Sequence, residues 1–264
     1  MEKKIAFFIR VYNESEALKK TLSQIPLKVL GYDTEIIIAD DCSHDDSVKI
    51  ARNFTDHIIV MEKNMGVGAA TKKGFEYLSK IDYFDFVVKF DGDGQHHLHF
   101  IPEIILRLIK LSDVVICSRF HPLSDQTYTP VDRILLNMIF TEMLRKITSW
   151  NLTDVRSGYM GFKADLVKRI APKLIVERYG IPMEILLRIW KENPDAIVSE
   201  ISHPAVYGGN ISARLQKKYS SEQIVQKSSR LQEAYSALLA VIEDMKITKE
   251  KILEINGFFS NNEY

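Results

Sequence analysis

The chain has 264 residues, of which 46% are hydrophobic and 27% are charged, enough to bury the core of one large domain with an addition. Lysine plus arginine and aspartate plus glutamate each number 35, so the formal net charge is +0; the basic excess of a general nucleic-acid-binding protein is missing, and we expect no nucleic-acid partner. The two cysteines, Cys42 and Cys117, are too few for a disulfide framework or a zinc cluster and fit a reducing compartment.

The apolar segments of the chain are short. The N-terminal run is too short for a signal peptide, and no window reaches the ~18 apolar residues that span a membrane. The most apolar helical stretch, residues 134–147, is interrupted by Arg145 and Lys146 among other polar residues. We therefore expect a cytoplasmic protein that is either soluble or peripheral at the cytoplasmic face of a membrane.

Short apolar runs alternate with helical patterns through the first half of the chain. The runs predict buried strands at residues 5–9, 35–39, 57–61, 84–90 and 113–118. The helical patterns cover residues 16–27, 47–53, 69–80 and 100–110. This alternation predicts an α/β fold, in which a mixed, mainly parallel sheet is flanked by helices and ligands bind at the carboxyl ends of the strands.

The second half of the chain is less regular. We expect an apolar helix at 131–150, a strand at 157–162, a helix at 181–191, a strand at 197–207 and helical structure at 221–255. In the last segment, apolar residues recur at three- and four-residue steps and form one stripe. The apolar helix and this stripe can rest on a membrane surface, pack a homodimer through the C-terminal helices, or pack within the fold.

The most informative stretch is VVKFDGDGQ, residues 87–95, an apolar strand that ends in two aspartates separated by Gly92. In an extended chain, residues two apart point to the same side, so Asp91 and Asp93 can reach one cation, and Gln95 continues the series. Carboxylate and amide oxygens suit Mg²⁺ or Mn²⁺. The sequence therefore predicts a metal site made of Asp91, Asp93 and Gln95.

Polar or glycine-rich residues also follow the other predicted strands. They are Tyr12, Asn13 and Glu14 after the first strand, Asp40 and Asp41 after the second, Asn64, Gly66 and Gly68 after the third, and Arg119 after the fifth. A carboxylate after the second strand suits a base or ribose, glycines before a helix suit a phosphate, and arginine suits bidentate phosphate recognition. The full glycine pattern of a dinucleotide-binding fold and the Walker motif are both missing.

Together these motifs resemble the family 2 glycosyltransferases of the GT-A fold, and among them the dolichyl-phosphate mannosyltransferase and polyprenyl-phosphate branch. The resemblance covers about residues 4–210 and rests on Tyr-Asn-Glu at 12–14, Asp-Asp-Cys-Ser-His-Asp at 40–45, Asn-Met-Gly-Val-Gly-Ala-Ala at 64–70, Asp-Gly-Asp-Gly-Gln-His at 91–96, Cys-Ser-Arg at 117–119 and Leu-Thr-Asp-Val-Arg-Ser-Gly-Tyr at 152–159. The chain departs from the family where Arg10-Val11 stands in place of a proline, where Cys42 replaces a glycine and His97 a proline, and in the loop at 207–214, a loose echo of Arg-x-x-Gly-x-Ser-Lys.

The resemblance implies a role for each matched residue. The donor-binding residues would be Tyr12, Asn13, Glu14, Asp40, Asp41, Asn64, Gly66, Gly68, Lys72, Asp91 and Gly92. The metal would be held by Asp91, Asp93 and Gln95, and an acceptor phosphate by Arg119, Arg133 and Asn137. Residues 1–212 would form the GT-A catalytic domain, with a nucleotide-sugar-binding half at 1–119 and an acceptor half at 120–212, and residues 213–264 a C-terminal helical extension.

The implied reaction is a metal-dependent, inverting transfer of a sugar from a UDP- or GDP-sugar, with Asp93 acting through the metal. A lipid-phosphate acceptor is already ionised and needs no base, whereas a saccharide hydroxyl needs a carboxylate to take its proton, for which Asp154 and Glu184 are the candidates. A sugar nucleotidyltransferase is disfavoured because residues 11–16 contain no glycine. A non-catalytic nucleotide-sugar-binding module is disfavoured by the intact motif at 91–95.

We expect Asp93→Ala to abolish sugar transfer and donor hydrolysis, because the substitution removes a predicted ligand of the metal that would neutralise the departing diphosphate. The measurement is the release of nucleotide from labelled donor sugars in the presence of Mn²⁺. Wild-type rates for this variant would contradict the metal-centred mechanism.

Overall fold

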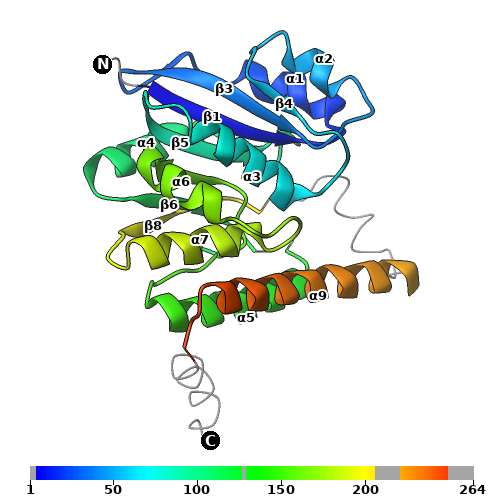
Figure 1. Ribbon diagram of the computed structural model, residues 1–264, viewed down its shortest axis with the longest axis vertical. Helices are drawn as coiled ribbons and strands as arrows, with labels where there is room; N and C mark the ends of the chain where they lie inside the picture. Colours follow the sequence, from blue (N-terminus) through cyan, green and yellow to red (C-terminus); the bar gives the residue numbers. More distant parts are fainter. Residues whose placement is uncertain (1–3, 127–128, 206–220, 249–264) are drawn as a thin grey trace, which may run out of the picture.

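The computed structural model describes residues 4–126, 129–205 and 221–248 (Figure 1). In this part of the chain, one eight-stranded sheet has the order β2-β3-β1-β5-β7-β6-β8, with β4 paired to β3. The strands are β1 (Lys4–Val11), β2 (Lys28–Val29), β3 (Tyr32–Asp40), β4 (Ile58–Val60), β5 (Phe84–Asp91), β6 (Val114–Ser118), β7 (Met160–Lys163) and β8 (Val198–Ser202). β2 and β7 are antiparallel to their neighbours and the other pairs are parallel, which confirms the predicted mixed, mainly parallel sheet.

Helices cover both faces of the sheet (Figure 1). They are α1 (Ser15–Ser23), α2 (Ser47–Ala51), α3 (Val67–Leu78), α4 (Ile101–Lys110), α5 (Val131–Thr148), α6 (Ala164–Ile170), α7 (Ile181–Glu192) and α9 (Ser221–Asp244), with short 3₁₀ turns at Leu98–Phe100 and Ala171–Lys173. The core between α3, α6, α7 and the sheet contains Phe8, whereas the core under α1 and α4 contains Phe7. Because successive residues of β1 are buried on opposite faces, its sequence is a continuous apolar run.

The predicted elements are present, and their ends differ by a few residues. The predicted helix at 16–27 ends at Ser23, because Pro26 follows and the chain turns into β2, which pairs antiparallel with β3. The predicted strand at 157–162 begins only at Met160. Neither β2 nor α6 was predicted. The predicted structure at 206–207 and 249–255, and the loop at 207–214, lie outside the described residues.

Helix α9 packs against the rest of the protein. Its Asp244 forms an ion pair of 2.6 Å with Arg188 of α7, and its Leu238 and Val241 belong to the same hydrophobic core as α3 and α7. The proposed boundary at residue 212 falls outside the described residues. Within the described part, the C-terminal helix therefore completes the core of the preceding segment.

We expect Gly74→Ala to lower the free energy of unfolding by about 1–3 kcal/mol, the cost of overpacking a filled core. A Cβ atom at position 74 of α3 would lie 2.0 Å from Cε2 of the Phe8 ring, so one of the two elements must move. Urea unfolding followed by circular dichroism measures the change. Lys73→Ala, at the exposed neighbouring position, is the control and should shift stability by less than about 0.5 kcal/mol. A Gly74→Ala variant as stable as this control would show that the contact is not tight.

Candidate active site

A cleft of about 480 Å³ lies at the carboxyl ends of β1, β3, β5 and β6 and is closed on its far side by α5 and residues 178–182. Ten of the residues predicted from the sequence line it: Tyr12, Asp41, Asn64, Gly66, Asp91, Asp93, Gln95, Arg119, Arg133 and Asn137. Eight predicted residues lie outside this lining: Asn13, Glu14, Asp40, Gly68, Lys72, Gly92, Asp154 and Glu184. The cleft thus joins the predicted donor residues to the predicted phosphate-binding arginines.

The two central carboxylates stand at the end of β5. Asp93 Oδ1 accepts the Gln95 backbone N–H at 3.0 Å, which folds the loop back on itself. A Cβ atom at Gly158 would lie 3.2 Å from Asp91 Oδ2, so the glycine keeps space open beside this oxygen. Burial and the charge of Asp93 raise the pKa of the nearby Glu14 to about 7. The electrostatic repulsion between such carboxylates is reduced when a cation binds between them.

These residues fit a divalent cation that is held jointly by protein and ligand. Among the described residues, no three histidine, cysteine, aspartate or glutamate side chains are placed to hold a metal by themselves. Mg²⁺ and similar hard cations are commonly held by one or two carboxylates together with substrate phosphates and water. Asp91, Asp93 and Gln95 suit this shared arrangement, and the amide of Gln95 lines the same cleft.

Two cations that were not predicted as site residues flank Asp91. Arg10 Nε donates to Asp91 Oδ1 at 3.1 Å, and Lys89 lies two residues before Asp91 on the same face of β5. The ammonium group of Lys89 is buried and donates to Gly158 O at 3.1 Å. Burial alone would raise the pKa of Asp91, but the charges of Arg10 and Lys89 lower it well below its usual range. Asp91 is therefore ionised at neutral pH.

His96 is bonded to the backbone at the end of β5. Its Nδ1 accepts the Asp91 backbone N–H at 3.1 Å, and its ring stacks on Tyr159 at a centroid distance of 5.1 Å. Desolvation lowers the pKa of His96 to about 4, so the imidazole is neutral near pH 7. The sequence analysis did not include it among the site residues, although it ends the motif at 91–96.

The side of the cleft near β3 is organised by Asp41. Its two oxygens accept the backbone N–H groups of Met65 at 2.9 Å and Gly66 at 2.8 Å, which ties the loop after β4 to the end of β3. Asp40 lies on the other side of the strand and accepts the Ser43 N–H at 2.8 Å, so it shapes the following turn. Asp41 is thus the aspartate of this pair that faces the cleft.

The glycines before α3 allow a close backbone contact. A Cβ atom at Gly68 would lie 2.2 Å from Val176 O, and the Ala69 N–H donates to Glu177 O at 2.7 Å. The N-terminus of α3 is therefore covered by residues 176–178. Of the two glycines before Ala69, Gly66 lines the cleft and Gly68 does not. Lys72 lies one turn further along α3.

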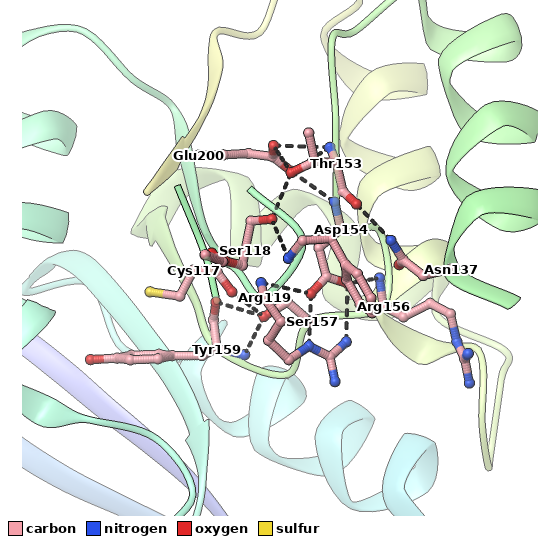
Figure 2. Close-up of polar contacts among 12 residues, drawn as sticks. Cys117, Ser118, Arg119, Asn137, Thr153, Asp154, Arg156, Ser157, Tyr159 and Glu200 are labelled. Carbon is pink, nitrogen blue, oxygen red and sulfur yellow. Dashed lines mark hydrogen bonds and ion pairs between the residues drawn. The ribbon is translucent and has the colours of Figure 1, made fainter. Parts of the chain in front are cut away.

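Arg119 is held by a buried carboxylate (Figure 2). Asp154 is fully buried, and its oxygens accept Arg119 Nε at 2.7 Å, Arg119 Nη2 at 3.0 Å and the Arg156 N–H at 3.1 Å. Glu200 of β8 in turn accepts the N–H groups of Thr153 at 2.8 Å and Asp154 at 3.0 Å. This chain of contacts fixes the position from which Arg119 enters the cleft.

Asn137 and Glu184 complete the supporting contacts. Asn137 of α5 donates to Thr153 O at 2.6 Å and so joins α5 to the loop that carries Asp154. Glu184 of α7 is buried and accepts the N–H groups of Ile175 at 2.9 Å and Val176 at 2.8 Å. Glu184 thereby anchors the segment that leads into the cleft wall at 178–182.

The cleft is rich in positive charge. Its lining carries six arginine and lysine side chains against three aspartates, and four of these cations were not predicted: Arg10, Lys89, Arg156 and Arg178. Lys89 could have been predicted from the sequence, because it is a charged residue inside an apolar run, two residues before Asp91. Nothing in the sequence pattern singles out Arg178. The excess of cations favours ligands that carry several negative charges, such as a diphosphate together with a phosphate.

Comparison with known proteins identifies a family. The sequence model described as "Glycosyl transferase family 2" matches residues 7–171. The chain is 27% identical over 191 residues to an undecaprenyl-phosphate mannosyltransferase of Micrococcus luteus, covering 70% of this chain and 77% of that protein. It is 29% identical over 210 residues to a UDP-N-acetylglucosamine–dolichyl-phosphate N-acetylglucosaminyltransferase of Methanococcus voltae, covering 73% of this chain and 82% of that protein.

A solved structure shares the fold. Glucosyl-3-phosphoglycerate synthase of Mycobacterium tuberculosis, crystallised with Mn²⁺, UDP-glucose and glycerol 3-phosphate, superposes with a TM-score of 0.64 at 17% sequence identity. The match covers 90% of this chain and 79% of that one. At this identity the likeness concerns the fold, which is the one expected from the sequence.

We expect Asp154→Asn to lower the free energy of unfolding by about 2–3 kcal/mol, because the Arg119 guanidinium would lose the charge of its buried partner. This is less than the roughly 3–5 kcal/mol that breaking a fully buried pair costs, because the Arg119 side chain is 28% exposed. Glu103→Gln, which removes an exposed pair with Arg107 on α4, is the matched control and should change stability by less than about 1 kcal/mol. Chemical denaturation measures both variants, and an Asp154→Asn protein as stable as wild type would contradict this supporting role.

Proposed function

This chain belongs to glycosyl transferase family 2, and we propose that it moves a sugar from a nucleotide-diphosphate sugar to a polyprenyl phosphate, with a divalent cation on the donor side and inversion at the anomeric carbon. The relatives whose names specify undecaprenyl phosphate and dolichyl phosphate as acceptors support the acceptor class. The UDP-glucose and Mn²⁺ of the structural neighbour support the donor class and the cation.

The donor side of the cleft suits a nucleotide diphosphate. Asp41 presents a carboxylate whose position is fixed by the loop at 64–66, and Tyr12 presents a ring from the end of β1. Asp91, Asp93 and Gln95 would hold the divalent cation, which when bound neutralises the charge that develops on the departing diphosphate. Arg10 and Lys89 add fixed positive charge on the same side.

One observation carries the choice of acceptor: Arg119 and Arg133 line the cleft, whereas neither of the carboxylates considered as a base does. The oxygens of Asp154 accept hydrogen bonds from Arg119 and Arg156. Those of Glu184 accept hydrogen bonds from residues 175–176 and from Arg188. A saccharide hydroxyl would need a free carboxylate to take its proton, but a phosphate is already ionised. The arrangement therefore favours a phosphate acceptor.

The chain's own residues would act by binding and orientation. Arg119 and Arg133 would hold the acceptor phosphate so that one of its oxygens faces the anomeric carbon from the side opposite the diphosphate. The bond from this carbon to the acceptor oxygen would form as the bond to the donor diphosphate breaks, and no proton needs to move. Asp154 would fix the Arg119 fork, and Glu184 would fix the wall at 178–182.

Helix α5 offers a surface through which a lipid acceptor can approach. Val131, Leu135, Met138 and Ile139 recur at helical spacing, and each is more than half exposed. Arg133 on the same helix lines the cleft. We include a membrane surface, on which this face would rest, in the proposed function. No helix in the described part of the chain is both long and apolar enough to cross a bilayer.

The domain division and the homodimer remain proposals. We retain the catalytic domain at 1–212 with its halves at 1–119 and 120–212 and the extension at 213–264. A homodimer through the C-terminal helices would have to use the outward side of α9, where Tyr235 and Leu239 are exposed.

The test is a transfer assay with UDP- and GDP-sugars, in which undecaprenyl phosphate is compared with undecaprenol and with free monosaccharides. We expect product only with the phosphate acceptor, an inverted anomeric configuration, and a large loss of rate in EDTA. Arg119→Ala and Arg133→Ala should lower kcat/KM for the acceptor by about 100-fold, the loss of roughly one charge-assisted contact to phosphate in a desolvated site.

The matched control is Arg145→Ala, which removes an arginine at the far end of α5 that pairs with Glu142 and Asn151. This variant should transfer at the wild-type rate. Equal rates with undecaprenol and undecaprenyl phosphate, or a monosaccharide acceptor that works as well, would refute the phosphate acceptor.

A further inference from the structure

The contact between Arg10 and Asp91 follows directly from the sheet. β1 and β5 are parallel neighbours, and their register places Arg10 opposite Asp91 at the carboxyl ends of both strands. Neighbouring residues in register project to the same face, so the two side chains meet, with 3.1 Å between Arg10 Nε and Asp91 Oδ1. Both side chains are only about one fifth exposed. The guanidinium of Arg10 therefore lines the cleft beside Asp91.

The charges near Arg10 are unevenly divided between Asp91 and Asp93. Lys89, on the same face of β5, adds a second cation near Asp91. On the other side, Glu14 and Asp93 face Arg10 and add negative charge. Asp91 is therefore compensated by the protein itself, with one oxygen engaged by the guanidinium, whereas Asp93 and Glu14 are not bonded to a cation by any contact found among the described residues.

This arrangement has two physical consequences. A divalent cation that approaches Asp91 must share it with the guanidinium and is repelled by it, so its affinity falls. A diphosphate in the cleft meets a positive charge beside Asp91 even when no divalent cation is bound, so part of the nucleotide affinity becomes independent of the metal.

We propose that Arg10 is a specificity-determining residue that sets the cation requirement of the donor site: it weakens divalent-cation binding to the Asp91–Asp93 pair and binds the donor diphosphate in the absence of that cation. The proposal rests on the proposed function, since it takes the diphosphate and the divalent cation to lie at these residues. Arg10 is also part of the Arg10-Val11 pair that stands in place of the family's proline.

The test measures binding in the free protein, without turnover. Mn²⁺ affinity is followed by the electron paramagnetic resonance signal of unbound Mn²⁺, and UDP and GDP affinities are measured by calorimetry in EDTA. The main variant is Arg10→Gln, which keeps a hydrogen-bond donor toward Asp91 but loses the charge. Arg10→Met is the second neutral variant, and Arg10→Lys restores the charge without the planar fork.

We expect both neutral variants to bind Mn²⁺ about tenfold more tightly than wild type, and to bind the preferred nucleoside diphosphate about tenfold more weakly in EDTA, as removal of one nearby charge predicts. Arg10→Lys should lie within about threefold of wild type in both measurements. Lys4→Met is the matched control, because it removes an ion pair of 2.7 Å with Glu35 at the opposite end of the same strand, and it should change neither affinity.

Unchanged or weaker Mn²⁺ binding in the neutral variants would overturn the proposal, as would an Arg10→Lys protein that behaves like Arg10→Gln. If every variant binds nucleotide normally in Mn²⁺ and has the same Mn²⁺ affinity as the wild type, the inference fails while the proposed transferase function stands. If the wild-type protein binds neither UDP nor GDP with or without Mn²⁺, the inference and the donor assignment fail together.

Discussion

The parallel pairing of β1 with β3 and β5 is the constraint on which the rest of the structure depends. It aligns Arg10 with Asp91 on one side and Val11 with Asp40 on the other, so three strands end at one edge of the sheet. Backbone hydrogen bonds continue this alignment past the strand ends, from Gly92 to Arg10 and from Asp41 to Val11. The polar residues that follow each strand are therefore brought to the same edge of the sheet, where Tyr12, Asp41, Asp91 and Asp93 line one cleft.

The second half of the chain uses buried carboxylates as structural anchors. Asp154, Glu184 and Glu200 each accept backbone N–H groups from irregular segments, and Asp154 and Glu184 also pair with an arginine. Irregular segments that are buried leave polar backbone groups to be satisfied, and a carboxylate can satisfy several of them at once. The loop at 152–159 and the segment at 174–180 thereby acquire fixed shapes without regular secondary structure. The first segment holds Arg119 through Asp154, and the second carries Gly180 into the cleft.

The cleft has a region suited to a cation and a region suited to an anion. The two central aspartates and Gln95 form the region suited to a divalent cation, and Arg119 after β6 and Arg133 of α5 form a region suited to an anion. Arg10 and Lys89 line the same cleft beside Asp91, on the neighbouring strands β1 and β5. A glycosyl transfer between a diphosphate and a phosphate brings several negative charges close together, and a floor of fixed cations lowers the cost of that approach.

The order of strands and helices followed from the sequence, because buried parallel strands must be continuous apolar runs and the helices between them must be amphipathic. The same reasoning located the motif at 91–95, which is predicted to bind a metal, and Arg119, since polar residues at strand ends have no role in the core. It did not detect β2 and α6, which are short and lack a distinctive pattern.

What the sequence determined was therefore the set of residues at each strand end, whereas the tertiary structure decided which of them face the cleft. Asp40 and Asp41 are adjacent in the chain, but only Asp41 lines the cleft, because successive side chains leave a strand on opposite faces. Asp154 and Glu184 resemble free bases in a sequence, yet their partners come from residues 119 and 175–176. The backbone N–H groups at the start of α1, from Asn13 to Ser15, donate to the side chains of Ser43, Asp45 and Ser47, which lie 30 to 33 residues further along the chain. The pairing of Arg10 with Asp91 also depends on the register of two strands about 80 residues apart, and a local pattern cannot encode contacts at that separation.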